Sequence, residues 1–145
     1  MTRKTATGIV FTLLFILVMV SVACEQERTD TELIESLEGR WLVKEDDSQY
    51  GESTYFINIS ISSRDSSKIF ISNFYDLGDE ISANVEGQRI NIDPNDQEIT
   101  SNTITYTIVS GSGTITDDYR YIDWRYQVDE GTGTPYEVAA SYEKQ

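Results

Sequence analysis

Apart from its carboxylates, this sequence offers few side chains that could carry out chemistry. The 145 residues include 25 Asp and Glu, 11 Lys and Arg, one Cys and no His. Serine is plentiful, but a serine nucleophile needs an activating base, and the sequence contains neither a His nor a Gly-x-Ser-x-Gly turn. One Cys cannot form an internal disulfide or a Cys-rich zinc site. These counts argue against ordinary nucleophilic, acid–base or zinc catalysis.

The carboxylates suggest two kinds of site. A glycosidase pair needs two carboxyl groups roughly 5–10 Å apart in a cleft, but most acids here fall in turns or, like Asp123, on the polar face of a strand. Residues 93–98 offer several oxygen ligands, as calcium prefers, but a hairpin turn explains them equally well. We therefore predict no catalytic residue, no metal and no cofactor. The net charge of −14 argues against a nucleic-acid partner.

The single Cys, Cys24, ends a segment unlike the rest of the chain. Arg3 and Lys4 form a basic start, residues 9–23 are almost wholly apolar, and no acidic residue precedes Glu25. This is the layout of a secretory signal. The apolar run is shorter than the roughly 20 residues that span a bilayer. Such a segment can be a lipoprotein signal, an uncleaved membrane anchor, or an ordinary cleaved signal with a leftover Cys.

The sequence Val20-Ser21-Val22-Ala23-Cys24 resembles the lipobox of bacterial lipoproteins, although Ser21 stands where Leu is usual. The resemblance implies a signal peptide over residues 1–23, a diacylglycerol on the Cys24 thiol, and a further acyl chain such as palmitate on the new amino group. Several acyl chains hold a protein firmly to a membrane. In such lipoproteins an Asp directly after the Cys is the signal for retention in the inner membrane. Glu25 follows Cys24 here, so the expected location is the outer membrane of a Gram-negative cell envelope.

The elements that would position any site begin after this segment. Residues 24–38 read as a lipidated tether and one short helix. A capping box over Thr29–Glu32 and a helical apolar face predict that helix at about residues 31–38, and Gly39 is a natural stop.

From Gly39 onward the apolar residues recur with a period of two, as in half-buried strands. A first strand opens at residues 39–41, and further strands are predicted at 55–62, 68–74, 81–85, 89–92, 103–108, 122–128 and 136–143. The glycines of Gly111-Ser112-Gly113 suggest a bulge, a sharp bend or a tight turn. Residues 39–145 are thus predicted to form an all-β antiparallel up-and-down meander of about eight strands. It would close into a barrel or, alternatively, form a two-sheet β-sandwich.

Gly39-Arg40-Trp41 resembles the Gly-x-Trp signature of the lipocalin and calycin barrels. Residues 110–115, 122–126 and the end Tyr142-Glu143-Lys144 are similar to small lipocalin-like lipoproteins of Gram-negative bacteria. The resemblance implies a lipocalin-like barrel whose Trp41 closes one end. In that family an Arg from the last strand often stacks on the Trp, and here the last strand offers only Lys144.

Together these features predict a lipid-anchored, non-enzymatic protein of the cell envelope, attached to the membrane through Cys24. The barrel would bind a small apolar ligand in a cavity lined by Trp41, Ile57, Ile59, Tyr106, Trp124 and Tyr126. The alternative is a structural or partner-binding surface lipoprotein with a packed core, which would contact another envelope protein through an exposed patch.

Overall fold

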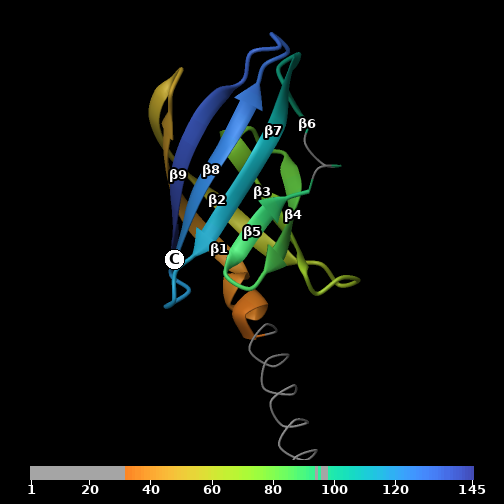
Figure 1. Ribbon diagram of the computed structural model, residues 1–145, viewed down its shortest axis with the longest axis vertical. Helices are drawn as coiled ribbons and strands as arrows, with labels where there is room; N and C mark the ends of the chain where they lie inside the picture. The colour runs from red at the N-terminus through yellow and green to blue at the C-terminus, as the bar shows by residue number, and fades with distance from the viewer. Residues whose placement is uncertain (1–31, 94, 96–97) are drawn as a thin grey trace, which may run out of the picture. The chain divides into compact units, whose positions relative to one another are not determined.

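A short helix at residues 32–37 precedes nine β-strands in the part of the chain that the computed structural model describes, residues 32–93, 95 and 98–145 (Figure 1). The predicted signal peptide 1–23, Cys24, the tether at residues 25–30 and most of the predicted capping box lie outside these residues. The strands are β1 Gly39–Asp47, β2 Gly51–Ile61, β3 Lys68–Ser72, β4 Glu80–Glu86, β5 Arg89–Ile92, β6 Glu98–Ser101, β7 Ile104–Ile115, β8 Tyr121–Asp129 and β9 Tyr136–Lys144. A 3-10 helix, η1 Phe74–Asp76, follows β3.

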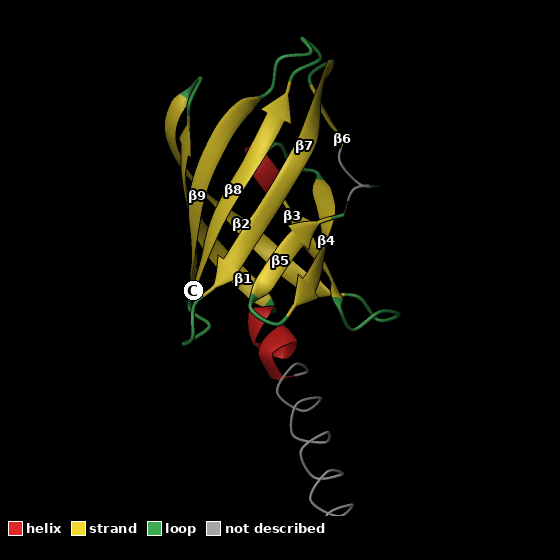
Figure 2. Ribbon diagram, viewed as in Figure 1, coloured by secondary structure: helices red, strands yellow, loops and turns green. Residues whose placement is uncertain are grey.

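The sheet closes on itself, as the ribbon in Figure 2 shows. Strands run antiparallel in the order β5-β4-β3-β2-β1-β9-β8-β7-β6, and β5 also pairs with β7. The N-terminal part of β7 pairs with β6, and its C-terminal part pairs with β5. Eight strands, β1–β5 and β7–β9, therefore form the barrel wall, and β6 extends it beside β7. The predicted closed meander is confirmed, and the sandwich alternative is wrong.

Strand β6 was not predicted, because its four residues contain a single apolar side chain, Ile99, and show no clear alternation. The glycines of β7 mark no turn, since the strand continues through them. Its register against β8 shifts between Ile108 and Ser110, which is a β-bulge. Gly113 is needed for a close approach, because a Cβ atom there would lie 2.9 Å from the indole of Trp124.

The helix at residues 32–37 packs against one end of the barrel, which we call the helix end. Leu33 and Leu37 are buried in the same core as the inward residues of the strands. Trp41 is fully buried, and its Nε1 donates a 2.9 Å hydrogen bond to the carbonyl of Leu37. Lys144 donates to the carbonyl of Ser36, and its Nζ lies 5.7 Å from the Trp41 ring centroid. Trp41 thus lies at the helix end of the barrel, and the cation nearest its ring comes from Lys144, the basic residue that the last strand offers.

Candidate functional site

The opposite end of the barrel, which we call the mouth, holds polar side chains inside the wall. The alternation of side chains along strand β1 places two of them there. Every second residue faces inward and is buried: Trp41, Val43, Glu45 and Asp47. Glu45 and Asp47 are only 5% and 4% exposed. Neither acid stands out in the sequence as a candidate site residue. Continuing the period of two from Trp41 would have placed both acids inside.

Glu45 lies at the centre of a group of phenols. Its Oε2 accepts a 2.6 Å hydrogen bond from the hydroxyl of Tyr55 on β2, and a second hydrogen bond from the hydroxyl of Tyr126 on β8. Burial raises the pKa of Glu45, because the charged carboxylate is poorly solvated there, while the two phenol hydrogen bonds act against the shift. The nearby charges of Asp47 and Asp76 raise this pKa further.

Tyr142 on β9 also faces the interior of the barrel. Its side chain is fully buried, and its hydroxyl has no hydrogen-bond partner within the described part of the chain. Burial raises the pKa of the Tyr142 phenol, and the charge of Glu45 adds to the shift. The Tyr142 ring packs on Trp124 with centroids 5.5 Å apart, and the Trp124 indole N–H is likewise without a partner among these residues. Buried polar atoms without partners are rare, because each costs about 1–3 kcal/mol.

Tyr75 covers this group from the mouth. Its hydroxyl donates to Oδ2 of Asp47 and lies 3.0 Å from the hydroxyl of Tyr136. Tyr136 in turn donates a 2.9 Å hydrogen bond to Glu130. Burial raises the pKa of the Tyr75 phenol, and the hydrogen bond to Asp47 adds to the shift. We call Glu45, Asp47, Tyr55, Tyr75, Tyr126, Tyr136 and Tyr142 the carboxyl–tyrosine cluster.

The backbone that carries Tyr75 is strained. Asn73, Tyr75 and Asp76 have φ values of 61°, 56° and 55°, in the left-handed region that residues with a Cβ atom seldom adopt. Edge-on contacts with Tyr126 and Tyr106, at centroid distances of 6.2 and 5.9 Å, hold the Tyr75 ring in place. Packing and hydrogen bonds at the mouth therefore compensate for an unfavourable local conformation.

The six residues predicted to line a cavity lie on the inward faces of their strands, at two levels. Trp41, Ile57 and Ile59 lie near the helix end, where Trp41 pairs with Ile57 and Gly39 with Ile59. Tyr106, Trp124 and Tyr126 lie nearer the mouth: Trp124 pairs with Ala140, the neighbour of Glu45 across β9, and Tyr106 contacts Tyr75. Only the second level adjoins the cluster. A ligand contact for any of the six stays a prediction.

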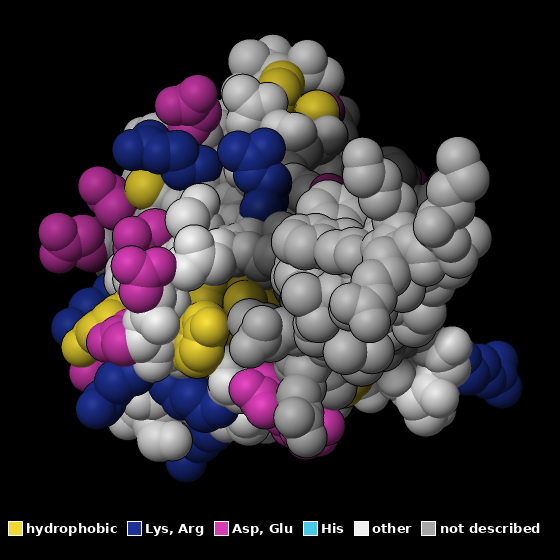
Figure 3. Space-filling model, turned by 60° about the horizontal axis from the view of Figure 1, so that its bottom comes forward, with side chains coloured by type: hydrophobic (Ala, Val, Ile, Leu, Met, Phe, Trp, Pro, Cys, Tyr) yellow, Lys and Arg dark blue, Asp and Glu magenta, His cyan; other side chains and the backbone are white. Residues whose placement is uncertain are grey.

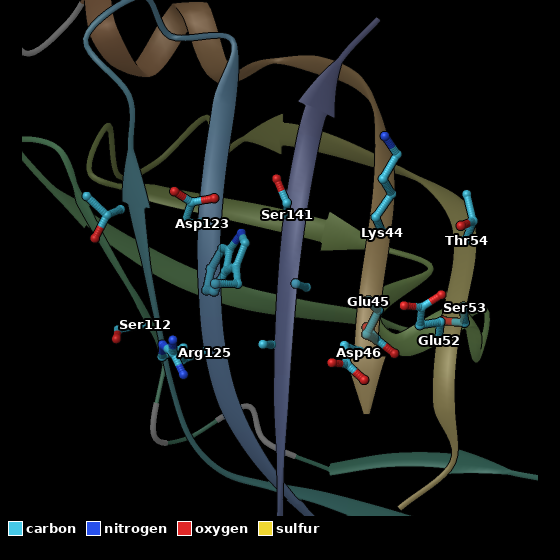
Figure 4. Close-up of a pocket in the computed structure, with 14 residues that line it drawn as sticks. Lys44, Glu45, Asp46, Glu52, Ser53, Thr54, Ser112, Asp123, Arg125 and Ser141 are labelled. Carbon is cyan, nitrogen blue, oxygen red and sulfur yellow. The ribbon is translucent and has the colours of Figure 1, made fainter. Parts of the chain in front are cut away.

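A separate groove of about 670 Å³ crosses the outer face of the barrel (Figure 4). Two rows of side chains run over it from β1 across β9 to β8: Lys44, Ser141 and Asp123, then Asp46, Ala139 and Arg125. The small side chains of β9 form the floor, and charges of both signs form the walls. Asp123 is exposed there, on the face opposite the core, as predicted.

Residues 32–93, 95 and 98–145 lack two further kinds of feature. No group of three or more Cys, Asp or Glu side chains in these ranges could hold a metal ion. No helix within them is long and apolar enough to cross a bilayer.

Fold and site together define a small closed antiparallel β-barrel with a buried polar cluster at one end. No protein-family model matches the chain, and no curated protein sequence matches it significantly. Among solved structures, the chain is similar to EF1p2_mFAP2b bound to DFHBI, a designed fluorescence-activating barrel. The TM-score is 0.53 and the sequence identity 17%, over 79% of this chain and 98% of that one. At this identity the likeness concerns the fold alone.

Two further structures are less similar. The redesigned barrel b11L5F_LGL has a TM-score of 0.47 and 13% identity, over 77% of this chain and 94% of that one. A crystal structure of a provisionally assigned outer membrane protein from Bacteroides fragilis has a TM-score of 0.48 and 15% identity. The match covers 78% of this chain and 52% of the Bacteroides protein, so it spans about half of that protein's length.

Proposed function

We propose that this protein is a lipid-anchored, non-enzymatic protein of the cell envelope whose barrel binds a small, mainly apolar ligand at its mouth. The observation that carries the proposal is the Tyr142 hydroxyl, which is fully buried and without a partner among the described residues, in a barrel interior that also buries the Glu45 carboxyl. A purely structural barrel gains stability from an apolar interior, and buried polar groups reduce it. Polar groups kept in this place are therefore better explained by a ligand that uses them.

The surroundings of the cluster suit a ligand that is mostly apolar with one polar group. Trp124, Phe74 and Tyr106 provide ring surface next to the polar atoms. EF1p2_mFAP2b, whose fold is similar, is bound to DFHBI, which supports the capacity of a barrel of this size to hold a small molecule. The polar end of the ligand would meet Glu45 and Tyr142, and its apolar part would lie against the rings.

Native mass spectrometry tests the binding role on the full chain, extracted from its membrane in mild detergent. We expect a co-purifying small molecule on the unaltered protein. Tyr142→Phe removes the unpartnered hydroxyl and keeps the ring, so the adduct should be reduced. Tyr121→Phe is the matched control, because Tyr121 is 38% exposed on the outside of β8. Absence of any adduct, together with no binding of small aromatic compounds by calorimetry, would refute the binding role.

The lipid anchor is proposed from the sequence of residues 1–24. The basic start, the short apolar run and the lipobox-like end at Cys24 support attachment by lipid to the outer membrane of a Gram-negative envelope. Cys24→Ser should release the protein from membranes and abolish labelling with palmitate. If the variant remains attached, residues 9–23 act as an uncleaved anchor and the lipid proposal fails.

Partner binding is the second candidate, and the outer groove favours it. Lys44 and Asp123 face each other across Ser141, and Arg125 faces Asp46 across Ala139. No ion pair engages these four charges within the described part of the chain, so they are open to a polar partner in the envelope. Arg125→Glu should weaken capture of such a partner, whereas Arg64→Glu, in a connection at the helix end, should not. Cross-linking in cells would measure both.

A further inference from the structure

We propose that the ligand held by the carboxyl–tyrosine cluster is an organic ammonium ion, an aliphatic or arylalkyl amine in its protonated form. This inference rests on the proposed binding role and names the class of ligand for the same site. It depends on three observations: the sign of the charge at the mouth, the arrangement of the aromatic rings, and the hydrogen-bonding groups left open inside.

The charge at the mouth is negative without a compensating cation. Four connections meet there, at residues 47–51, 73–79, 101–104 and 129–136. They contain five acids and no Lys or Arg: Asp47, Asp76, Asp79, Asp129 and Glu130. The ion pair found within the described residues joins Lys68, the first residue of β3, to Asp93, which follows β5, and so lies outside these four connections. A field of one sign at a cleft favours a ligand of the opposite sign.

The helix end has a different composition. Its connections carry Arg64, Arg89 and Arg120, and Lys144 lies beside the helix. In Figure 3, which brings this end forward, basic and acidic side chains are interspersed among the described residues. The presence of acids without any Lys or Arg is therefore specific to the connections at the mouth. The net negative charge of the chain alone would not confine it to one end.

Aromatic rings gather around Tyr126, whose hydroxyl binds Glu45. Phe74 packs against Tyr126 with centroids 5.0 Å apart, and Tyr75 meets Tyr126 and Tyr106 edge-on. Aromatic faces attract cations at distances up to about 6 Å, and groups of such rings recognise ammonium ions. Rings alone would serve an apolar ligand equally well. Their combination with buried carboxylates distinguishes an ammonium ion from a neutral molecule.

Two polar groups inside the barrel can accept a further hydrogen bond, one oxygen of Glu45 and the hydroxyl of Tyr142. Tyr55 and Tyr126 both donate to Oε2 of Glu45, which leaves Oε1 of the same carboxylate as an acceptor for a further donor. The Tyr142 hydroxyl, fully buried and unpartnered among the described residues, can act as a second acceptor, and burial together with the charge of Glu45 raises the pKa of this phenol. Burial raises the pKa of Glu45, and a cation beside it would offset that shift by stabilising the carboxylate. An ammonium group supplies both the hydrogens and the charge.

Access to this position requires movement of Tyr75. Its ring lies between Tyr106 and Tyr126, and its hydroxyl is bound to Asp47 and Tyr136. The three left-handed residues around it make this segment less stable than the strands that it adjoins. Displacement of Tyr75 would also free the Asp47 carboxylate to face the cation.

The test uses three probes of similar size and different charge on the full chain in non-ionic detergent: 2-phenylethylamine, 2-phenylethanol and phenylacetate. Binding is measured by calorimetry and by the fluorescence of the two tryptophans. We expect the protonated amine to bind at least 10-fold more tightly than the alcohol or the acid. Glu45→Gln should reduce that preference about 10-fold, and the exposed outer-face variant Asp123→Asn should leave it unchanged.

The outcomes separate the inference from the binding role beneath it. If the alcohol or the acid binds as tightly as the amine, or if folded Glu45→Gln keeps the full preference, the ammonium inference is overturned and the binding role stands. If no probe binds, the adduct seen by native mass spectrometry decides: a compound without a basic nitrogen overturns the inference, and no adduct at all overturns both. The three-probe comparison on the unaltered chain remains decisive even if Glu45→Gln fails to fold.

Discussion

The Nζ of Lys144 lies 5.7 Å from the centroid of the Trp41 ring and donates to the carbonyl of Ser36. One side chain from the last strand thus joins the first strand to the helix that precedes it. A lysine can make this contact as an arginine can, because either cation is attracted to the face of an indole ring. It also gives the helix end a stability that can be measured separately from binding at the mouth.

Removal of this cation should destabilise the barrel. We expect Lys144→Ala to lower the free energy of unfolding by about 1 kcal/mol, from the lost ring contact and the lost hydrogen bond. Lys144→Arg should retain most of this stability, because the arginine keeps a cation near the Trp41 ring. Urea denaturation measures both, and Lys44→Ala on the outer face is the control. Equal stability of Lys144→Ala and the unaltered protein would show that the contact adds nothing.

The buried carboxyl of Glu45 should make stability depend on pH. Its pKa is raised above the ordinary value of 4.5 by burial, so the folded state favours the protonated form. The stabilising contribution of that proton is complete below the ordinary pKa, and it is lost as the pH rises through the raised pKa. The groups that act on this pKa are Tyr126 and Tyr55 through hydrogen bonds, and Asp47 and Asp76 through their charges.

Glu45→Gln removes this titration while keeping an acceptor for the two phenols. We expect the variant to be more stable than the unaltered chain at pH 7, by about 1 kcal/mol, with the difference shrinking toward pH 4. Thermal unfolding across that range measures it. Glu52→Gln, an exposed acid on β2, serves as the control. If the two chains differ in stability by the same amount at every pH, the buried carboxyl of Glu45 is not the cause of the pH dependence.

Gly113 tests the packing of the barrel wall on Trp124. A Cβ atom at Gly113 would lie 2.9 Å from two atoms of the indole and 3.0 Å from the side chain of Ile122. Both neighbours are fully buried or nearly so, and they cannot move away freely. Gly113→Ala should therefore cost about 1–3 kcal/mol, whereas Ser112→Ala, on the outer face, should cost little. A change in near-ultraviolet circular dichroism should accompany the loss, because the environment of Trp124 is altered.

The strain at the mouth can be tested at Asp76, whose φ is 55°. Glycine accepts this conformation without a steric penalty, whereas alanine does not. We expect Asp76→Gly to be about 1 kcal/mol more stable than Asp76→Ala, and both variants lack the carboxylate. Chemical denaturation compares them. If alanine is as stable as glycine, the segment around Tyr75 is not strained in solution.

Much of the barrel could be predicted from the sequence alone. The alternation of apolar residues depends only on the period of a strand, and it placed Trp41, Ile57, Trp124 and Tyr126 on inward faces that the structure confirms. The short connections indicated an antiparallel meander, and the helical apolar face with Gly39 as a stop indicated the end of the helix to within one residue. These features are local, so they can be read without knowledge of the partners of each strand.

The carboxyl–tyrosine cluster depended on tertiary structure. Glu45, Tyr55, Tyr126 and Tyr142 come from four strands, and only closure of the sheet brings their polar atoms together. An acid near the end of a strand looks like a solvated residue until the opposite wall of the barrel covers it. The double pairing of β7, with β5 along one part and β6 along another, was equally unpredictable, because it depends on contacts between distant segments. The sequence by itself determined the strands and their inward faces, and the closure of the sheet decided which inward polar groups meet.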